Sequence, residues 1–174
     1  MLNKILLFTF IIGTFSVFGQ FKKEKLKIYW PEEYKWKTVY NVEDSTMSLT
    51  QIIPQSETAT SWTIAGTIRV SKKLVVPNIS SVIESYSNAA LKESAKAKVT
   101  VLEKSDSSKT YWIILKTETS DFPNDPNPES DLIYICQGSQ NHYAAFVGIR
   151  EKQFSKEFEK KWIEIFKKSS LQYD

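Results

Sequence analysis

The sequence contains very little cysteine, histidine and glycine. With one cysteine and one histidine in 174 residues, it cannot supply CxxC, HExxH or a haem-attachment motif, all of which combine several such side chains. A lone cysteine forms no internal disulfide, so we expect packing alone to stabilise the fold. Beyond residue 20 the only glycines are Gly66, Gly138 and Gly148, which are too far apart to form a phosphate-binding or dinucleotide-binding loop.

These absences, together with the lack of a GxSxG serine motif, predict that the protein is not an enzyme and holds no cofactor. Pairs of carboxylates need no sequence motif, however. A carboxylate-dependent hydrolase therefore stays open as an alternative, with Glu32 and Glu33 or Asp121 and Asp125 as the candidate pairs.

The only cysteine and the only histidine lie close together, in CQGSQNH (residues 136–142). Cys136 ends one predicted strand and His142 begins the next, with a hairpin turn between them. Successive side chains of a strand point to opposite faces, so a turn of two or four residues places the two side chains on opposite faces of the sheet. Only an odd-length turn brings them to one side. Because Cys136 also shares its face with Leu132 and Tyr134, we expect a buried thiol rather than a nucleophile.

The first nineteen residues have the layout of a secretory signal peptide. Lys4 precedes an apolar run over residues 5–18, and Gly19 offers a small residue for cleavage. The apolar run is shorter than the roughly 20 residues that span a bilayer, so we expect no integral membrane segment after cleavage. An uncleaved anchor is the alternative. The sequence thus predicts an exported protein, periplasmic or secreted.

The rest of the chain carries little net charge. Of 23 lysines and arginines only Lys4 is lost with the signal peptide, so against 20 acidic residues the mature net charge is 22 − 20 = +2. Nucleic-acid binding needs a concentrated basic surface, which this balance does not indicate. We expect residues 20–44 to form a charged, mobile N-terminal segment (21–27) followed by an aromatic first strand region. Residues 45–174 are expected to form a single α+β domain.

Two kinds of hydrophobic spacing predict the fold class. Alternation with a period of two indicates strands over residues 47–53, 62–70, 98–104, 109–119, 131–137 and 143–150, joined by turn-forming residues. Helical spacing appears after Pro77, to about residue 95, and after Ser155, where Phe158, Trp162, Ile165 and Phe166 form one stripe. Short turns between consecutive strands require antiparallel pairing. The sequence therefore predicts an α+β fold: one antiparallel β-sheet flanked by helices.

Several segments in their order resemble a known family. They are the strand pair LTQIIP and SWTIAGTIRV, the helix after VVPN, the strand YWIILKTET, the hairpin DLIYICQGSQNHYAAFVGIR and the closing helix SKEFEKKWIEIFKKS. This order resembles the PsbP/Mog-type domains, which include the extrinsic P subunit of photosystem II, the Ran-binding Mog proteins and small exported bacterial proteins. The resemblance implies an αβα sandwich and an accessory or binding role. It transfers no site residue and no partner.

Two segments contain candidate binding residues. The aromatic stretch YWPEEYKWKTVY supplies Trp30, Tyr34, Trp36 and Tyr40, and alternation places the last three on one face of an extended segment. These rings would stack on a sugar or hold an apolar ligand, or they pack in the core.

The acidic loop SDFPNDPNPESD is a second candidate, for calcium. Its oxygen ligands would be Asp121, Asp125, Asn127 and Glu129. Ser130 stands where a calcium loop needs glycine, and Cys136 stands where it needs a bidentate glutamate. A solvated loop that binds no metal is therefore the favoured interpretation.

Taken together, the residues predict an exported non-catalytic accessory or binding protein with an unknown protein or small-molecule partner. A subunit of a cell-envelope assembly is the first alternative, and it requires an exposed apolar patch.

Overall fold

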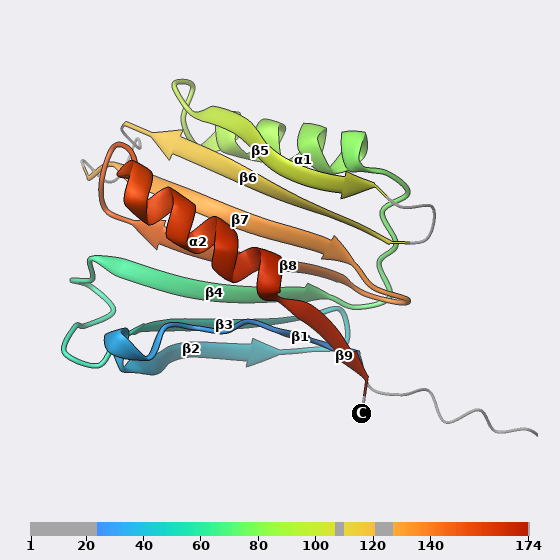
Figure 1. Cartoon of the computed structure of the whole chain (residues 1–174), viewed down its shortest axis with the longest axis horizontal. Coiled ribbons are helices and arrows are strands. Elements are labelled where there is room, and N and C mark those ends of the chain that lie inside the picture. Colours follow the sequence, from blue (N-terminus) through green and yellow to red (C-terminus); the bar gives the residue numbers. More distant parts are fainter. Residues whose placement is uncertain (1–23, 107–109, 121–126, 174) are drawn as a thin grey trace, which may run out of the picture.

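The computed structural model describes residues 24–106, 110–120 and 127–173, and its main feature is a seven-stranded antiparallel sheet (Figure 1). The strand order is β2-β3-β4-β8-β7-β6-β5, and every neighbouring pair is antiparallel. The strands are β2 (Trp36–Glu43), β3 (Met47–Pro54), β4 (Ile64–Ser71), β5 (Lys98–Asp106), β6 (Tyr111–Thr119), β7 (Glu129–Gln137) and β8 (His142–Ile149). The predicted α+β class, an antiparallel sheet flanked by helices, is confirmed.

Two helices pack on opposite faces of this sheet, as Figure 1 shows. Helix α1 spans Ile79–Glu93 and helix α2 spans Lys156–Lys168. The predicted cap of α2 is confirmed, because Ser155 Oγ accepts a hydrogen bond from Phe158 N at 3.1 Å. Helix α1 begins later than Pro77, since Asn78 is its cap and Asn78 Oδ1 accepts from Ser81 N at 2.9 Å. Among the described residues, no helix is long and apolar enough to cross a membrane.

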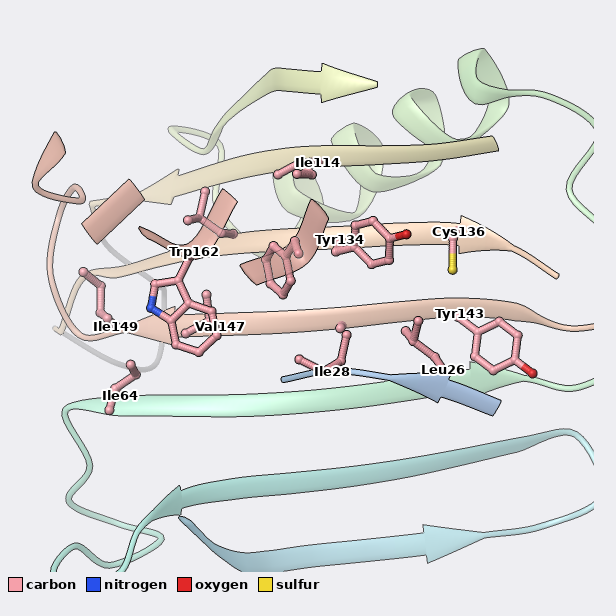
Figure 2. Packing of buried hydrophobic residues seen from close by; sticks show 13 residues of the cluster. Leu26, Ile28, Ile64, Ile114, Tyr134, Cys136, Tyr143, Val147, Ile149 and Trp162 are labelled. Atoms are coloured by element: carbon pink, nitrogen blue, oxygen red, sulfur yellow. The ribbon is translucent and has the colours of Figure 1, made fainter. Parts of the chain in front are cut away.

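The larger part of the core lies between α2 and the sheet (Figure 2). Trp162 and Phe166 of α2 are fully buried against Ile64, Tyr134 and Val147 of the strands. Burial of two such large side chains stabilises the fold by roughly 3–6 kcal/mol before entropy is counted. The predicted apolar stripe of the closing helix therefore covers this face of the sheet.

The second part of the core lies between α1 and the opposite face. Ile79 and Val82 pack there on β6, β7 and β8, and Tyr86 reaches β4, where its hydroxyl accepts a hydrogen bond from Arg69 at 2.7 Å. Helix α1 lies against β5 and β6, at one side of the sheet. At the other side of the same face, Tyr40 and Val42 of β2 are 53% and 37% exposed. The α1 face is thus covered over only part of its width.

A separate two-stranded ribbon joins the two ends of the described chain. Strand β1 (Glu24–Lys27) pairs antiparallel with β9 (Ser170–Tyr173), so that Glu24 lies opposite Tyr173. The expectation of a mobile charged terminus over residues 21–27 is wrong for its described part. Residues 21–23 lie outside the described residues. Leu26 and Ile28 are buried in the core on the α2 side, where Figure 2 shows them with Tyr143 and Val147.

Residues 24–44 belong structurally to the same body as the other residues that the structure describes. β2 is an edge strand of the main sheet and β1 is held by the C-terminal β9. The expected boundary at residue 44 therefore falls inside the β2–β3 hairpin.

Candidate functional site

Cys136 and His142 lie on opposite faces of the sheet. In the β7–β8 hairpin Cys136 is opposite Tyr143 and Gln137 is opposite His142, which leaves a turn of four residues, 138–141. Cys136 packs in the core on the α2 side, and burial raises the pKa of its thiol to about 12. Burial, together with the nearby charge of Arg69, lowers the pKa of His142 to about 4. Both groups are neutral near pH 7 and cannot form a thiolate–imidazole pair, as turn parity predicted.

Three of the four candidate aromatic residues form one cluster. Trp30 and Trp36 have ring centroids 5.7 Å apart, Tyr34 lies 4.9 Å from Trp36, and Trp30 lies 5.8 Å from the buried Trp162 of α2. Trp36 Nε1 donates a hydrogen bond to Pro31 O at 2.9 Å, which holds the short 3-10 helix η1 (Glu32–Tyr34) against the strand. The three rings are half-buried and extend the core of α2. Packing therefore accounts for their positions, and a binding role for them stays a prediction.

Tyr40 does not share a face with Trp36. The β2–β3 register shifts between Thr38 and Tyr40, because Val39 forms a bulge. A one-residue shift moves every following side chain to the opposite face. Tyr40 therefore points to the α1 side of the sheet, opposite Gln51, whereas Trp36 lies on the α2 side.

The first predicted carboxylate pair does not converge in a cleft. Glu32 and Glu33 are both exposed on η1, and Glu33 forms an ion pair with Lys161 of α2 at 2.5 Å. The hydrogen bond from Lys161 lowers the pKa of Glu33. An exposed, paired carboxylate of this kind is suited to fastening η1 on α2 rather than to acid–base work.

The predicted calcium loop is only partly visible. Asp121 and Asp125 lie outside the described residues, Asn127 is exposed, and Glu129 lies within strand β7 rather than in a loop. In the described parts of the chain, no group of three or more histidine, cysteine, aspartate or glutamate side chains is arranged to hold a metal ion. A calcium role for these four residues stays a prediction.

The structure brings together another pair of carboxylates, Glu129 and Asp131, which lie two residues apart on the same face of β7. Asp131 lies opposite Gly148, and a Cβ atom on Gly148 would lie 2.7 Å from Asp131 Oδ1. Burial, and secondly the charge of Glu129, raise the pKa of Asp131 to about 8. The signal in the sequence was the two-residue spacing of Glu129 and Asp131 at the start of a strand, whereas their proximity to Gly148 arises only in the folded sheet.

A groove of about 520 Å³ lies between β1 and the end of the β3–β4 part of the sheet. We call it the β1 groove. Its floor is apolar and consists of Ile68 and Val70 of β4, with Leu26 of β1 beside them. Polar residues form its rim: Glu24, Lys25, Glu43, Ser45, Ser48, Lys72, Lys73, Ser139, Gln140 and Asn141. The groove thus combines an apolar floor with a charged rim, and its residues come from several distant segments.

The two glutamates at the rim are already engaged. Lys72 Nζ forms an ion pair with Glu43 at 2.6 Å. The same ammonium group donates a hydrogen bond to the backbone oxygen of Asp44 at 2.6 Å. Glu24 Oε2 accepts hydrogen bonds from Ser139 N at 2.7 Å and Ser139 Oγ at 2.8 Å. Burial acts to raise the pKa of Glu24, but the hydrogen bonds from Ser139 outweigh it and the pKa is lowered. The carboxylate of Glu24 is therefore charged near pH 7 and fixed to the β7–β8 turn, whereas that of Glu43 is paired with Lys72 at an exposed position.

Lys73 differs from these residues because its backbone is in the left-handed region, with φ at 55°. Such a conformation costs a non-glycine residue about 1 kcal/mol. The backbone N–H of Lys73 donates to Asn141 Oδ1 at 3.1 Å, which holds the residue against the β7–β8 turn. Its side chain is exposed at the rim of the β1 groove. This position places a cation at the mouth of the apolar floor.

Comparison with known proteins yields similarity to solved structures alone. No protein-family model matches the chain, and no curated protein sequence matches it. The Ran-binding protein Mog1p of Saccharomyces cerevisiae is 6% identical, with a TM-score of 0.39 over 82% of this chain and 84% of that one. A point variant of the protein Mog1 is 5% identical, with a TM-score of 0.40 over the same shares.

The α+β arrangement of an antiparallel sheet and two helices is observed in the structure of this chain itself. Membership of the PsbP/Mog-type family is not shown. No function is carried over from either structure.

Proposed function

We propose that this chain is an exported, non-catalytic binding protein that holds its ligand in the β1 groove. The observation that carries the proposal is the groove itself, with its volume of about 520 Å³, its floor of Leu26, Ile68 and Val70, and its charged rim. Sites for small ligands typically measure about 300–1,000 Å³ and combine an apolar lining with a few polar groups. The β1 groove has both properties.

The neutral states of the reactive side chains support a binding role without chemistry. Cys136 is buried with a raised pKa, and His142 lies on the other face with a lowered one. Neither lines the β1 groove, and the glutamates that do line it are engaged by Ser139 and Lys72. A groove with these partners favours recognition over proton transfer.

Export is the second element of the proposal and rests on the sequence. The signal-like segment, residues 1–19, lies outside the described residues. Cell fractionation of a host that expresses the full chain tests it, with the mass of the recovered protein as readout. We expect protein outside the cytoplasm, shortened by residues 1–19. Full-length protein in the cytoplasm would refute export.

A fluorescence titration with the anionic apolar dye 1-anilinonaphthalene-8-sulfonate tests the groove. We expect Val70→Asp to weaken binding of the dye at least fivefold, because a carboxylate on the floor repels the sulfonate and removes apolar surface. Val42→Asp is the matched control, since Val42 is an exposed apolar strand residue outside the groove. Equal dye binding by the native protein and by Val70→Asp, with both folded, would contradict the proposal.

A subunit of a cell-envelope assembly is the second candidate, and one observation favours it. The α1 face is uncovered at β2, where Tyr40 and Val42 are exposed. If this face docks a neighbouring subunit, Tyr40→Glu releases the protein from its native complex during gel filtration of envelope extracts. Val70→Asp would leave such a complex intact, which distinguishes the two candidates.

A further inference from the structure

Resting on the proposed function, we infer that the natural occupant of the β1 groove is an extended acidic peptide, which adds as a strand to the free edge of β1. The inference names the chemical class of the ligand. It depends on the edge of β1, the spacing of the floor residues and the charges at the rim.

In the part of the chain that the structure describes, strand β1 pairs with β9 alone, so its other edge has no strand neighbour there. The groove is lined by three consecutive residues of β1, Glu24, Lys25 and Leu26. No described residue of β9 lines the groove, so the edge of β1 that faces away from β9 borders it. The free edge of a strand offers backbone N–H and C=O groups to another extended chain.

The end of β1 is fixed, which makes this edge a rigid template. Tyr143 Oη donates a hydrogen bond to Glu24 O at 3.0 Å, and the carboxylate of Glu24 holds Ser139 on the β7–β8 turn. Leu26 is buried in the core on the α2 side. A peptide that pairs with β1 would meet a strand that is already ordered, so little conformational entropy would be lost on the protein side.

The floor has the spacing of an extended peptide. Ile68 and Val70 lie two residues apart on the same face of β4, and the groove continues to Lys72. At about 3.3 Å per residue, the four steps from Ile68 to Lys72 span ~13 Å, which is the length of about four extended residues. Alternate side chains of such a peptide would point at the floor with the same two-residue spacing, so apolar residues are expected there.

The charges at the rim select an acidic partner. Glu43 is paired with Lys72, and Oε2 of Glu24 accepts hydrogen bonds from Ser139. Lys73 presents its side chain to solvent at the mouth of the groove. Carboxylates on the outward-facing residues of the peptide, or its terminal carboxylate, would meet this cation.

The test uses the full protein and a fluorescein-labelled hexapeptide of alternating valine and aspartate with a free C-terminus. Binding is measured by fluorescence polarisation at low salt. Two matched peptides separate the terms. One carries N-methyl groups on alternate backbone amides, which removes strand donors, and the other replaces aspartate by lysine. We expect both to bind at least tenfold more weakly than the parent peptide.

Two lysine variants of the protein test the role of the cation at the rim, one as the test and the other as its control. Lys73→Gly removes the cation and suits the backbone, since glycine adopts a φ of 55° without strain. We expect it to weaken the parent peptide about three- to tenfold while the melting temperature stays the same or rises. Lys35→Gly is matched to it, because Lys35 also has a positive φ of 46° and does not line the β1 groove. We expect this variant to bind the peptide like the native protein.

The outcomes separate the inference from the function on which it rests. Equal binding of the N-methylated and parent peptides would overturn strand addition, and equal binding of the lysine peptide would overturn the acidic preference. If no peptide binds but the dye still binds in a manner sensitive to Val70→Asp, the groove stands and its peptide ligand is refuted. If neither peptide nor dye binds, both proposals fail.

Discussion

The indole ring of Trp30 fills the space beside Gly66 that a Cβ atom would need. A Cβ built on Gly66 would lie 2.6 Å and 2.8 Å from two ring atoms of Trp30 and 2.9 Å from Ile52 Cγ1. Trp30 also packs edge-on against Trp162 at 5.8 Å between centroids. The glycine thus allows the N-terminal segment to lie flat on the sheet beside α2.

Substitution Gly66→Ala should therefore destabilise the fold. The indole ring is held by Trp36 and Trp162 and cannot yield by rotation of a flexible end, so we expect a loss of about 1–3 kcal/mol of unfolding free energy. Guanidinium denaturation followed by tryptophan fluorescence measures it. Thr67→Ala, the next residue of β4 on the opposite face, is the control and should lose less. A Gly66→Ala protein as stable as the native one would contradict the close approach.

The single histidine should titrate far below its usual range. Burial and Arg69 lower the pKa of His142 to about 4, and its Nε2 is buried with no hydrogen-bond partner among the described residues. With one histidine in the chain, a single pair of imidazole C–H signals is expected, so their chemical shifts against pH by NMR yield the pKa directly. We expect a midpoint near 4. A midpoint near 6.5 would show that the imidazole is in contact with water.

The same shift makes stability depend on pH. Between about pH 6.5 and 4 the unfolded chain takes up a proton on His142 that the folded chain does not, so stability falls as the pH falls through this window. In His142→Gln this contribution is absent. The stability of the native protein relative to the variant should therefore drop by about 3 kcal/mol between pH 7 and pH 4. A constant difference would contradict the burial of a neutral imidazole.

Asp131 has the opposite dependence. Its folded pKa of about 8 exceeds the usual value, so the folded protein keeps a proton that the unfolded chain has released. The stabilising effect of that proton is complete below about pH 4 and is lost as the pH rises to about 8. Asp131→Asn keeps the shape without the ionisation. The stability of this variant relative to the native protein should increase by about 1–3 kcal/mol from pH 4 to pH 8. This range is smaller than the full pKa shift would give, because Asp131 is partly exposed and solvent screens its charge.

Urea unfolding at several pH values checks this expectation. Glu84→Gln, an exposed carboxylate on α1, is the control and should show no such trend. If Asp131→Asn behaves like Glu84→Gln, the carboxyl group of Asp131 is ionised in the fold.

The thiol of Cys136 should be inert in the native protein. It is buried between β-sheet and α2, and its pKa is raised to about 12, so almost no thiolate is present near pH 8. We expect no reaction with Ellman's reagent over the time in which the protein in guanidinium reacts completely. Rapid labelling of the native protein would show an accessible thiolate and would contradict the conclusion that Cys136 is an unreactive buried thiol.

Local patterns in the sequence predicted much of this fold. Alternation in β4 identified Ile64, Ile68 and Val70 as one face, and helical spacing identified Trp162 and Phe166 as the buried side of α2. The opposite placement of Cys136 and His142 followed from the length of one turn. These features depend on neighbouring residues, whose spacing is visible in the chain itself.

Other features were missed because they depend on distant residues or on a local irregularity. β1 has only four residues, and its partner β9 lies at the other end of the chain, so no local pattern indicates the pairing. The bulge at Val39 moved Tyr40 to the other face, although the alternation continued in the sequence. The β1 groove combines residues from β1, β4 and two hairpin turns, and only the tertiary fold brings them together.

The pairing of β1 with β9 also determines when the β1 groove can form during synthesis. β1 is made before the main sheet, whereas its strand partner among the described residues, Ser170–Tyr173, is made after it. The main sheet can assemble from β2 to β8 while β1 still waits without a partner. One wall of the hollow is therefore completed only after the main sheet has been synthesised, and a chain that stops before Ser170 would be unable to engage a ligand there.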